Sequence, residues 1–198
     1  MTHYRTIASP AQTEYKDRGS RFIAHAFPIT SIEDFKKQLK ALKETHSKAA
    51  HHCFAYRIGT DGTAFRASDD GEPSGSAGKP ILGQLDSKGL TNTAVVVVRY
   101  FGGTLLGVPG LINAYKTSAS LALQLAPALE KPVLVNYVLE FDYTHMNDVM
   151  IFIKRYNGVV LQNEAQLFCR LVVGVPKAEE MVFAERIGDL HGVTIRKP

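Results

Sequence analysis

Apolar residues follow two periods along the chain, and together these periods predict a mixed α+β protein. Residues 95–98 are all valine, and a run that is apolar on both sides is typical of a central strand covered on both faces. Elsewhere, alternating apolar residues predict further strands, and spacings of three and four residues predict helices. In the first two thirds of the chain we expect strands at 21–29, 49–59, 64–66 and 95–98, and helices at 32–42, 80–85 and 111–125.

The pattern changes after two proline-containing dipeptides, Ala126-Pro127 and Lys131-Pro132, which are typical of a domain boundary. We therefore predict two domains, 1–131 and 132–198. In the second, the expected elements follow the order βαββαβ between residues 133 and 196. This order is typical of the ferredoxin-like, split-βαβ plan.

Two stretches contain more glycine than packing alone requires, and we expect them to be neighbours in space. The second follows the apolar strand and reads RYFGGTLLGVPG over residues 99–110. The first, residues 68–80, fails the P-loop pattern because Pro73 takes the place of the first glycine and Pro80 follows Lys79. The residues that define this first loop are Asp69, Asp70, Gly71, Glu72, Pro73, Gly75 and Gly78.

No metal or cofactor is predicted. Asp69, Asp70 and Glu72 form an acidic cluster that suits Mg²⁺ chemically, but aspartate before glycine is more typical of turn formation. His51 and His52 are adjacent on a predicted strand, so their side chains point to opposite faces and do not share one zinc ion.

The second glycine-rich stretch predicts an anion site because it leads to the N-terminus of a helix, where free amides and the helix dipole favour negative charge. We expect phosphates to be held by four side chains and three backbone amides, with either of two aromatic rings stacking on a base where it is exposed. The alternative is that the glycines only allow close packing and the aromatics belong to the core. The candidates are Arg99, Lys79, Arg57 and His51, the amides of Gly102, Gly103 and Gly107, and the rings of Tyr100 and Phe101.

Charge and cysteine content refine this picture. Residues 1–131 hold 16 basic and 11 acidic residues, a net charge of +5, whereas the remainder holds 7 and 8, a net charge of −1. Any contact with a polyanion is therefore expected in the first domain. We expect Cys53 and Cys169 to be buried free thiols, as is typical of proteins in a reducing compartment. The sequence predicts neither a signal peptide nor a membrane span. We expect a cytoplasmic protein.

Three stretches resemble the signature of the IMPACT family, in its bacterial YigZ-like branch: HHCFAYRIG, ASDDGEPSGSAGKPIL and VVVVRYFGGTLLGVPGLINAY. The resemblance covers essentially the whole chain. It implies an N-terminal domain like the second domain of a small-subunit ribosomal protein and like domain IV of elongation factor G. It also implies a ferredoxin-like C-terminal domain like domain V of that factor.

Eukaryotic members of this family resemble regulators of translation that compete for the activator of an amino-acid-starvation kinase, through an additional RWD domain. The present sequence begins almost directly with the IMPACT region. We therefore do not expect this protein to bind the activator of the kinase. The resemblance implies a binding protein linked to translation, which contacts RNA, the ribosome or a translation factor. Two alternatives are a metal-assisted phosphate-handling hydrolase that uses Asp69, Asp70 and Glu72, and a protein-interaction module that binds no nucleic acid.

Overall fold

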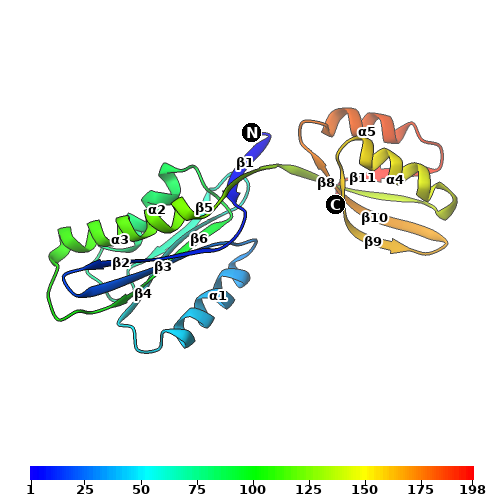
Figure 1. Cartoon of the computed structure of the whole chain (residues 1–198). Helices are drawn as coiled ribbons and strands as arrows, with labels where there is room; N and C mark the ends of the chain where they lie inside the picture. The colour runs from blue at the N-terminus through cyan, green and yellow to red at the C-terminus, as the bar shows by residue number, and fades with distance from the viewer. The chain divides into compact units, whose positions relative to one another are not determined.

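The computed structural model describes residues 1–198, and its contacts divide the chain into two compact units. One unit comprises residues 4–131, and the other comprises residues 1–3 and 132–198. Both units combine sheets and helices, so the structure confirms the prediction of a mixed α+β protein (Figure 1). None of the helices is both long enough and apolar enough to cross a membrane.

The 4–131 unit is built on a five-stranded sheet in which every pair of neighbouring strands is antiparallel. The all-valine segment lies in the central strand, as predicted, and its side chains are buried on both faces of the sheet. In spatial order the strands are β2 (Ala11–Asp17), β3 (Ser20–Pro28), β6 (Thr93–Tyr100), β4 (His51–Ile58) and β5 (Ala64–Ser68).

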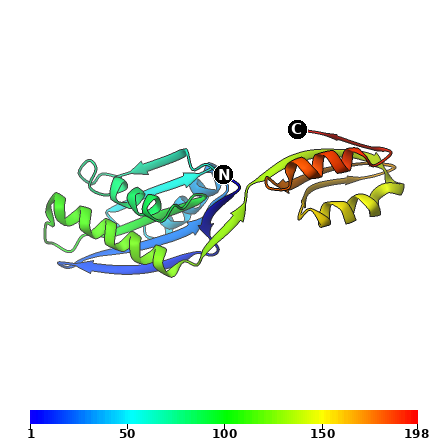
Figure 2. The ribbon, with the colours of Figure 1, turned by 90° about the horizontal axis from the view of Figure 1, so that it is seen from above.

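Helices cover both faces of this sheet (Figures 1 and 2). One face packs against α1 (Ile32–Thr45), whose N-terminus is capped by the Ser31 hydroxyl, which accepts a hydrogen bond from the Asp34 amide at 3.1 Å. The other face packs against α2 (Gly78–Ser87) and α3 (Gly107–Leu125). Two short strands, β1 (His3–Ile7) and β7 (Ala128–Pro132), pair with each other.

Two local predictions differ from the structure. The Asp61-Gly62 dipeptide predicts a type I′ hairpin turn, which requires positive φ at both central residues, but only Gly62 has one. The β4–β5 connection is instead a longer loop, in which the Asp61 carboxylate accepts hydrogen bonds from the amide and hydroxyl of Thr63. Helix α3 begins at Gly107 rather than near Leu111, because a proline in the first helical turn needs no amide donor.

The second unit follows the predicted βαββαβ order, and its four-stranded antiparallel sheet has the spatial order β11-β8-β10-β9. Both helices contribute to one apolar core with the sheet, and the buried Cys169 belongs to it. The elements are β8 (Leu134–Asp142), the short 3₁₀ helix η1 (Tyr143–His145), α4 (Met146–Arg155), β9 (Val159–Ala165), β10 (Phe168–Pro176), α5 (Glu180–Gly188) and β11 (Val193–Arg196).

Candidate functional site

The two glycine-rich stretches meet at one end of the five-stranded sheet, as the sequence predicts. We call residues 69–77, between β5 and α2, the acidic loop, and residues 101–106, between β6 and α3, the glycine loop. The His51 ring donates a hydrogen bond from Nδ1 to the Asp70 carbonyl at 2.8 Å, and β4 places His51 directly beside Arg99 of β6. The turn between β2 and β3 lies at the same end, because an added Cβ on Gly102 would lie only 1.9 Å from the Gly19 carbonyl carbon.

A buried carboxylate connects the two loops. Only 3% of the Glu72 side chain is exposed, and its Oε1 atom accepts hydrogen bonds from Arg99 Nη1 at 2.7 Å and from the Tyr115 hydroxyl at 2.6 Å. These three residues come from the acidic loop, the end of β6 and the middle of α3. Because an isolated buried charge is costly, the pairing of Glu72 with Arg99 fixes the acidic loop against the sheet. We call these three residues the Glu72 network.

The same arginine also fixes the glycine loop. Its Nη2 atom lies 3.4 Å from the hydroxyl of Ser20, which in turn accepts a hydrogen bond from the Gly102 amide at 3.2 Å. The guanidinium carbon lies 5.5 Å from the centre of the Phe22 ring and 5.7 Å from that of Phe101. Arg99 is therefore enclosed by protein groups and only 5% exposed, so the direct phosphate contact predicted for it does not fit its position.

A thiol beside the network and the Tyr115 hydroxyl within it are both held in their neutral forms. The Cys53 thiol donates to the Asp69 carbonyl at 3.0 Å and contacts the Tyr115 hydroxyl at 3.3 Å. Burial raises the pKa of the Cys53 thiol to about 12, and burial together with the neighbouring thiol raises the pKa of Tyr115. A thiol of such high pKa is a structural donor rather than a nucleophile.

The carboxylates of the acidic loop have separate partners. Asp69 accepts hydrogen bonds from the amides of Gly75, Ala77 and Gly78 at 2.8 to 3.1 Å, at the N-terminus of α2. Burial raises the pKa of Asp69, but these three amides outweigh that effect and lower it overall. Asp70 instead accepts from the His52 amide at 2.7 Å.

With Glu72 turned towards Arg99, the three acidic side chains do not converge on a common point. No group of three or more histidine, cysteine, aspartate or glutamate side chains is arranged to hold a metal ion. The arrangement therefore favours turn formation by this loop over the alternative of a magnesium site.

Several of the predicted contact residues line the outer surface of this end of the sheet. Lys79 is exposed in the first turn of α2, and the Phe101 side chain is 52% exposed. Gly102, Gly103 and Gly107 are exposed as well. In the acidic loop Gly71 and Pro73 are exposed, Gly75 is half-buried and Gly78 is buried against the Ser68 backbone.

Two predicted residues have other surroundings. Tyr100 is half-buried, and its hydroxyl lies 2.9 Å from the His46 Nδ1 atom. Arg57 does not join the group, because it lies at the far end of β4, opposite Thr93 and roughly 20 Å along the strand from His51. There it pairs with Asp86 at 2.6 Å and donates to the Gly62 carbonyl.

The sequence analysis did not identify Ser20 or Tyr115 as site residues, because each lies outside the two glycine-rich stretches. The position of Tyr115 in its helix could have indicated its role. A tyrosine in the middle of a largely buried helix needs a hydrogen-bond partner for its hydroxyl, and the nearby strands and loops are the places to find one.

Known proteins that are similar to this chain belong to the family that the sequence motifs indicated, and the similarity extends over nearly the whole chain. The Impact N-terminal domain matches residues 18–123. The IMPACT family member YigZ of Escherichia coli (strain K12) is 33% identical over 191 residues, which are 96% of this chain and 94% of that protein. Protein IMPACT of Rattus norvegicus is 40% identical over 96 residues, 46% of this chain and 30% of that protein.

A solved structure agrees with the fold as well. The crystal structure of a hypothetical protein superposes with a TM-score of 0.80 at 31% identity, covering 100% of this chain and 98% of that one. The matched domain spans both loops of the Glu72 network, and the likeness to YigZ extends through the second unit. The chain therefore belongs to the IMPACT family.

Proposed function

We propose that this protein is a translation-linked binding protein that contacts structured RNA through the outer surfaces of the acidic loop and the glycine loop. One observation carries the proposal: the buried Glu72 network fixes two exposed glycine-rich loops side by side at one end of the sheet. Rigid, exposed backbone amides at the start of a helix suit phosphate groups, and the neighbouring Lys79 adds positive charge. The Phe101 ring offers a face on which a base can stack.

Within this proposal, the roles of the predicted residues divide into two kinds. Lys79, Phe101 and the amide of Gly103 are contact groups because they are exposed, whereas the Gly102 amide is already bonded to the Ser20 hydroxyl. Arg99 is a positioning residue, since its guanidinium is buried between Glu72 and the two phenylalanine rings.

The translation context rests on family membership and fold analogy. The proposed fold likeness is to domains IV and V of elongation factor G, with the first unit also resembling the second domain of a small-subunit ribosomal protein. Fold likeness alone does not define a partner. We propose the cytoplasm as the compartment and the ribosome or a translation factor as the setting of the contact.

The test is a salt titration of binding to a fluorescent RNA stem-loop and to purified ribosomes. The variant Lys79→Ala/Phe101→Ala removes one cation and one aromatic ring from the loop surface. We expect weaker binding at every salt concentration and a slope of log K against log[salt] that is shallower by about 1. The matched control is Lys88→Ala/Phe65→Ala, which removes the same two groups from the far ends of α2 and of the β4–β5 hairpin.

Equal loss in both double variants would show that these loops are not the contact. Binding by wild-type protein that persists after nuclease treatment and at high salt would instead favour the protein-interaction alternative. That alternative would use the exposed apolar surface formed by Leu105, within the glycine loop, and by Val108 and Ile112, which follow it.

A further inference from the structure

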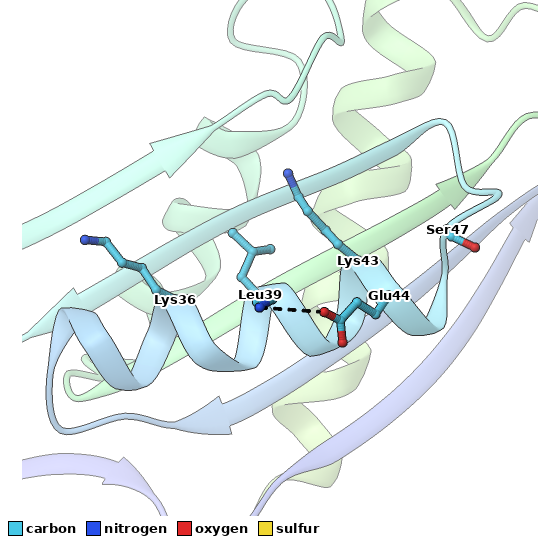
Figure 3. A pocket seen from close by; sticks show the side chains of 6 residues that line it. Lys36, Leu39, Lys43, Glu44 and Ser47 are labelled. Carbon is cyan, nitrogen blue, oxygen red and sulfur yellow. Dashed lines mark ion pairs between the residues drawn. The ribbon is translucent and has the colours of Figure 1, made fainter.

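Helix α1 presents a row of lysines along one flank, beside the apolar face that packs on the sheet. Lys36, Lys40 and Lys43 are separated by four and three residues, so they lie within one narrow arc of the helix surface. All three are exposed, and Figure 3 shows Lys36 and Lys43 projecting from the same side of α1, with Leu39 between them. The apolar stems of these residues and Ser47 line one shallow hollow along the helix.

Two of the three lysines of this row have an acidic partner, and Lys36 has none. The Lys40 ammonium lies 3.9 Å from the Glu44 carboxylate, and the Lys43 ammonium lies 3.8 Å from the Asp70 carboxylate. The Lys40 side chain is 79% exposed and the Lys43 side chain is 49% exposed. Exposed ion pairs at such distances are weak and give way to a stronger anion. The helix's other acidic residues, Glu33 and Asp34, lie in its first turn and stabilise the helix N-terminus instead.

The spacing of the row matches a repeating anion. At 1.5 Å per residue, Lys36 and Lys40 are separated by about 6 Å along the helix, and Lys36 and Lys43 by about 10 Å. Flexible lysine side chains at such intervals can each meet a successive phosphate of a nucleic acid backbone.

The row also leads to the site described above. The C-terminal end of α1 contacts the loop end of the sheet through Lys43 and Asp70 and through His46 and Tyr100. Just beyond the helix, the Ala50 amide donates to the Arg99 carbonyl at 3.0 Å. One extended polyanion is therefore able to touch both surfaces of the same unit.

We propose that the lysine row of α1 binds the phosphate backbone of the RNA whose other contact is the pair of glycine-rich loops. This inference rests on the proposed function for the identity of the polyanion, and it adds a second, sequence-independent contact surface. The loops then supply base stacking and local phosphate contacts, whereas the helix supplies affinity that depends on charge alone.

The experiment uses the full chain and the variant Lys36→Gln/Lys40→Gln/Lys43→Gln. Glutamine keeps the helix propensity of lysine and removes only the charge. With a fluorescent RNA stem-loop titrated from about 50 to 200 mM salt, we expect the slope of log K against log[salt] to become shallower by about 2 to 3. The loss should be the same for stem-loops of unrelated sequence.

The matched control removes three exposed basic residues from the other unit, Lys154→Gln/Arg155→Gln/Lys177→Gln, and should leave the slope unchanged. Circular dichroism and the thermal midpoint show whether α1 remains folded. If the Lys79→Ala/Phe101→Ala variant binds RNA less well but the triple variant of α1 does not, the lysine-row proposal is wrong and the proposed function stands.

Three other outcomes are equally informative. If the triple variant of α1 loses RNA while the loop variant does not, the lysine row is supported and the loops are not the contact. If the triple variant keeps its RNA but loses binding to vesicles that contain phosphatidylserine, the row binds an anionic membrane and the present inference is overturned. No salt-dependent RNA binding by the wild-type protein would overturn both proposals.

Discussion

Glu72 shows how one side chain determines the shape of the candidate site. Its carboxylate joins Arg99 at the end of β6 to Tyr115 in α3, and both partners lie far from it in sequence. Once these groups are buried, the charge on Arg99 has no other acidic partner within ion-pair distance. The rigidity of both loops therefore depends on this carboxylate.

Replacing Glu72 by glutamine should destabilise the protein by about 3 to 5 kcal/mol, because removal of one partner leaves a buried arginine uncompensated. The measurement is urea-induced unfolding, in which the midpoint falls while the m-value stays constant. Glu14→Gln is the matched control, since Glu14 pairs with Arg21 at the exposed surface. Similar shifts in the two variants would contradict the structural role proposed for Glu72.

The sequence predicted which loops meet but not how Arg99 is used. In β6 the side chains of Val95 and Val97 face α2 and α3, and continued alternation places Arg99 on that same buried side. Its partner Glu72 lies 27 positions earlier, in a loop that has no period from which a direction can be inferred. Periodicity therefore gives the face of Arg99, whereas its ion pair depends on the tertiary fold.

At the scale of elements, the contact between α1 and the sheet includes a histidine, His25, with a buried ring nitrogen that has no hydrogen-bond partner. His25 of β3 lies beneath α1, in a depression that Gln38 and Leu42 of the helix also line. Its Nε2 atom is buried and has no partner, and its ring centre lies 5.6 Å from that of His46. Burial, with a smaller contribution from His46, lowers the pKa of His25 from 6.5 to about 4.

This contact should weaken in acid. In the unfolded chain His25 takes up a proton near pH 6.5, whereas in the folded protein it does so only near pH 4. Between these values the unfolded state binds more protons, so the stability present above pH 6.5 is progressively lost as the pH falls towards 4. The His25→Gln variant should show a smaller loss of unfolding free energy over this interval than the wild-type protein, measured by urea unfolding at several pH values.

Parallel pH dependences of the wild-type protein and His25→Gln would contradict that assignment. His46→Gln provides a graded comparison, because it removes the neighbouring charge and leaves the burial of His25 unchanged. We expect its pH dependence to lie between those of the other two proteins.

The elements that the sequence predicted are those with large buried faces. The helical spacing of apolar residues predicted α1, and the run of valines predicted β6. Both elements bury a continuous apolar surface, which leaves a clear pattern in the sequence. Strands β1, β2 and β7 were not predicted, since β2 alternates only partly buried residues with exposed ones and β7 is exposed throughout. Such strands form because neighbouring strands offer hydrogen bonds, and this information is absent from their own sequence.

At the scale of the whole molecule, the two units have separate apolar cores and different charges. The cores of the first unit lie on the two faces of its own sheet, and the second unit has a third core that shares no residue with them. Residues 1–132 carry a net charge of +5 and residues 133–198 a net charge of −1. Contact with a polyanion should therefore belong to the first segment alone.

Fragments 1–132 and 133–198 test this division, because the cut falls between β7 and β8 and preserves every strand of all three sheets. We expect fragment 1–132 to bind the RNA stem-loop with the affinity and salt slope of the full chain, and fragment 133–198 to show no salt-dependent binding. Circular dichroism of each fragment verifies that it is folded. A folded 1–132 fragment with a markedly shallower salt slope than the full chain would show that phosphate contacts also come from the second unit, whose exposed arginines and lysines would then be the next residues to replace.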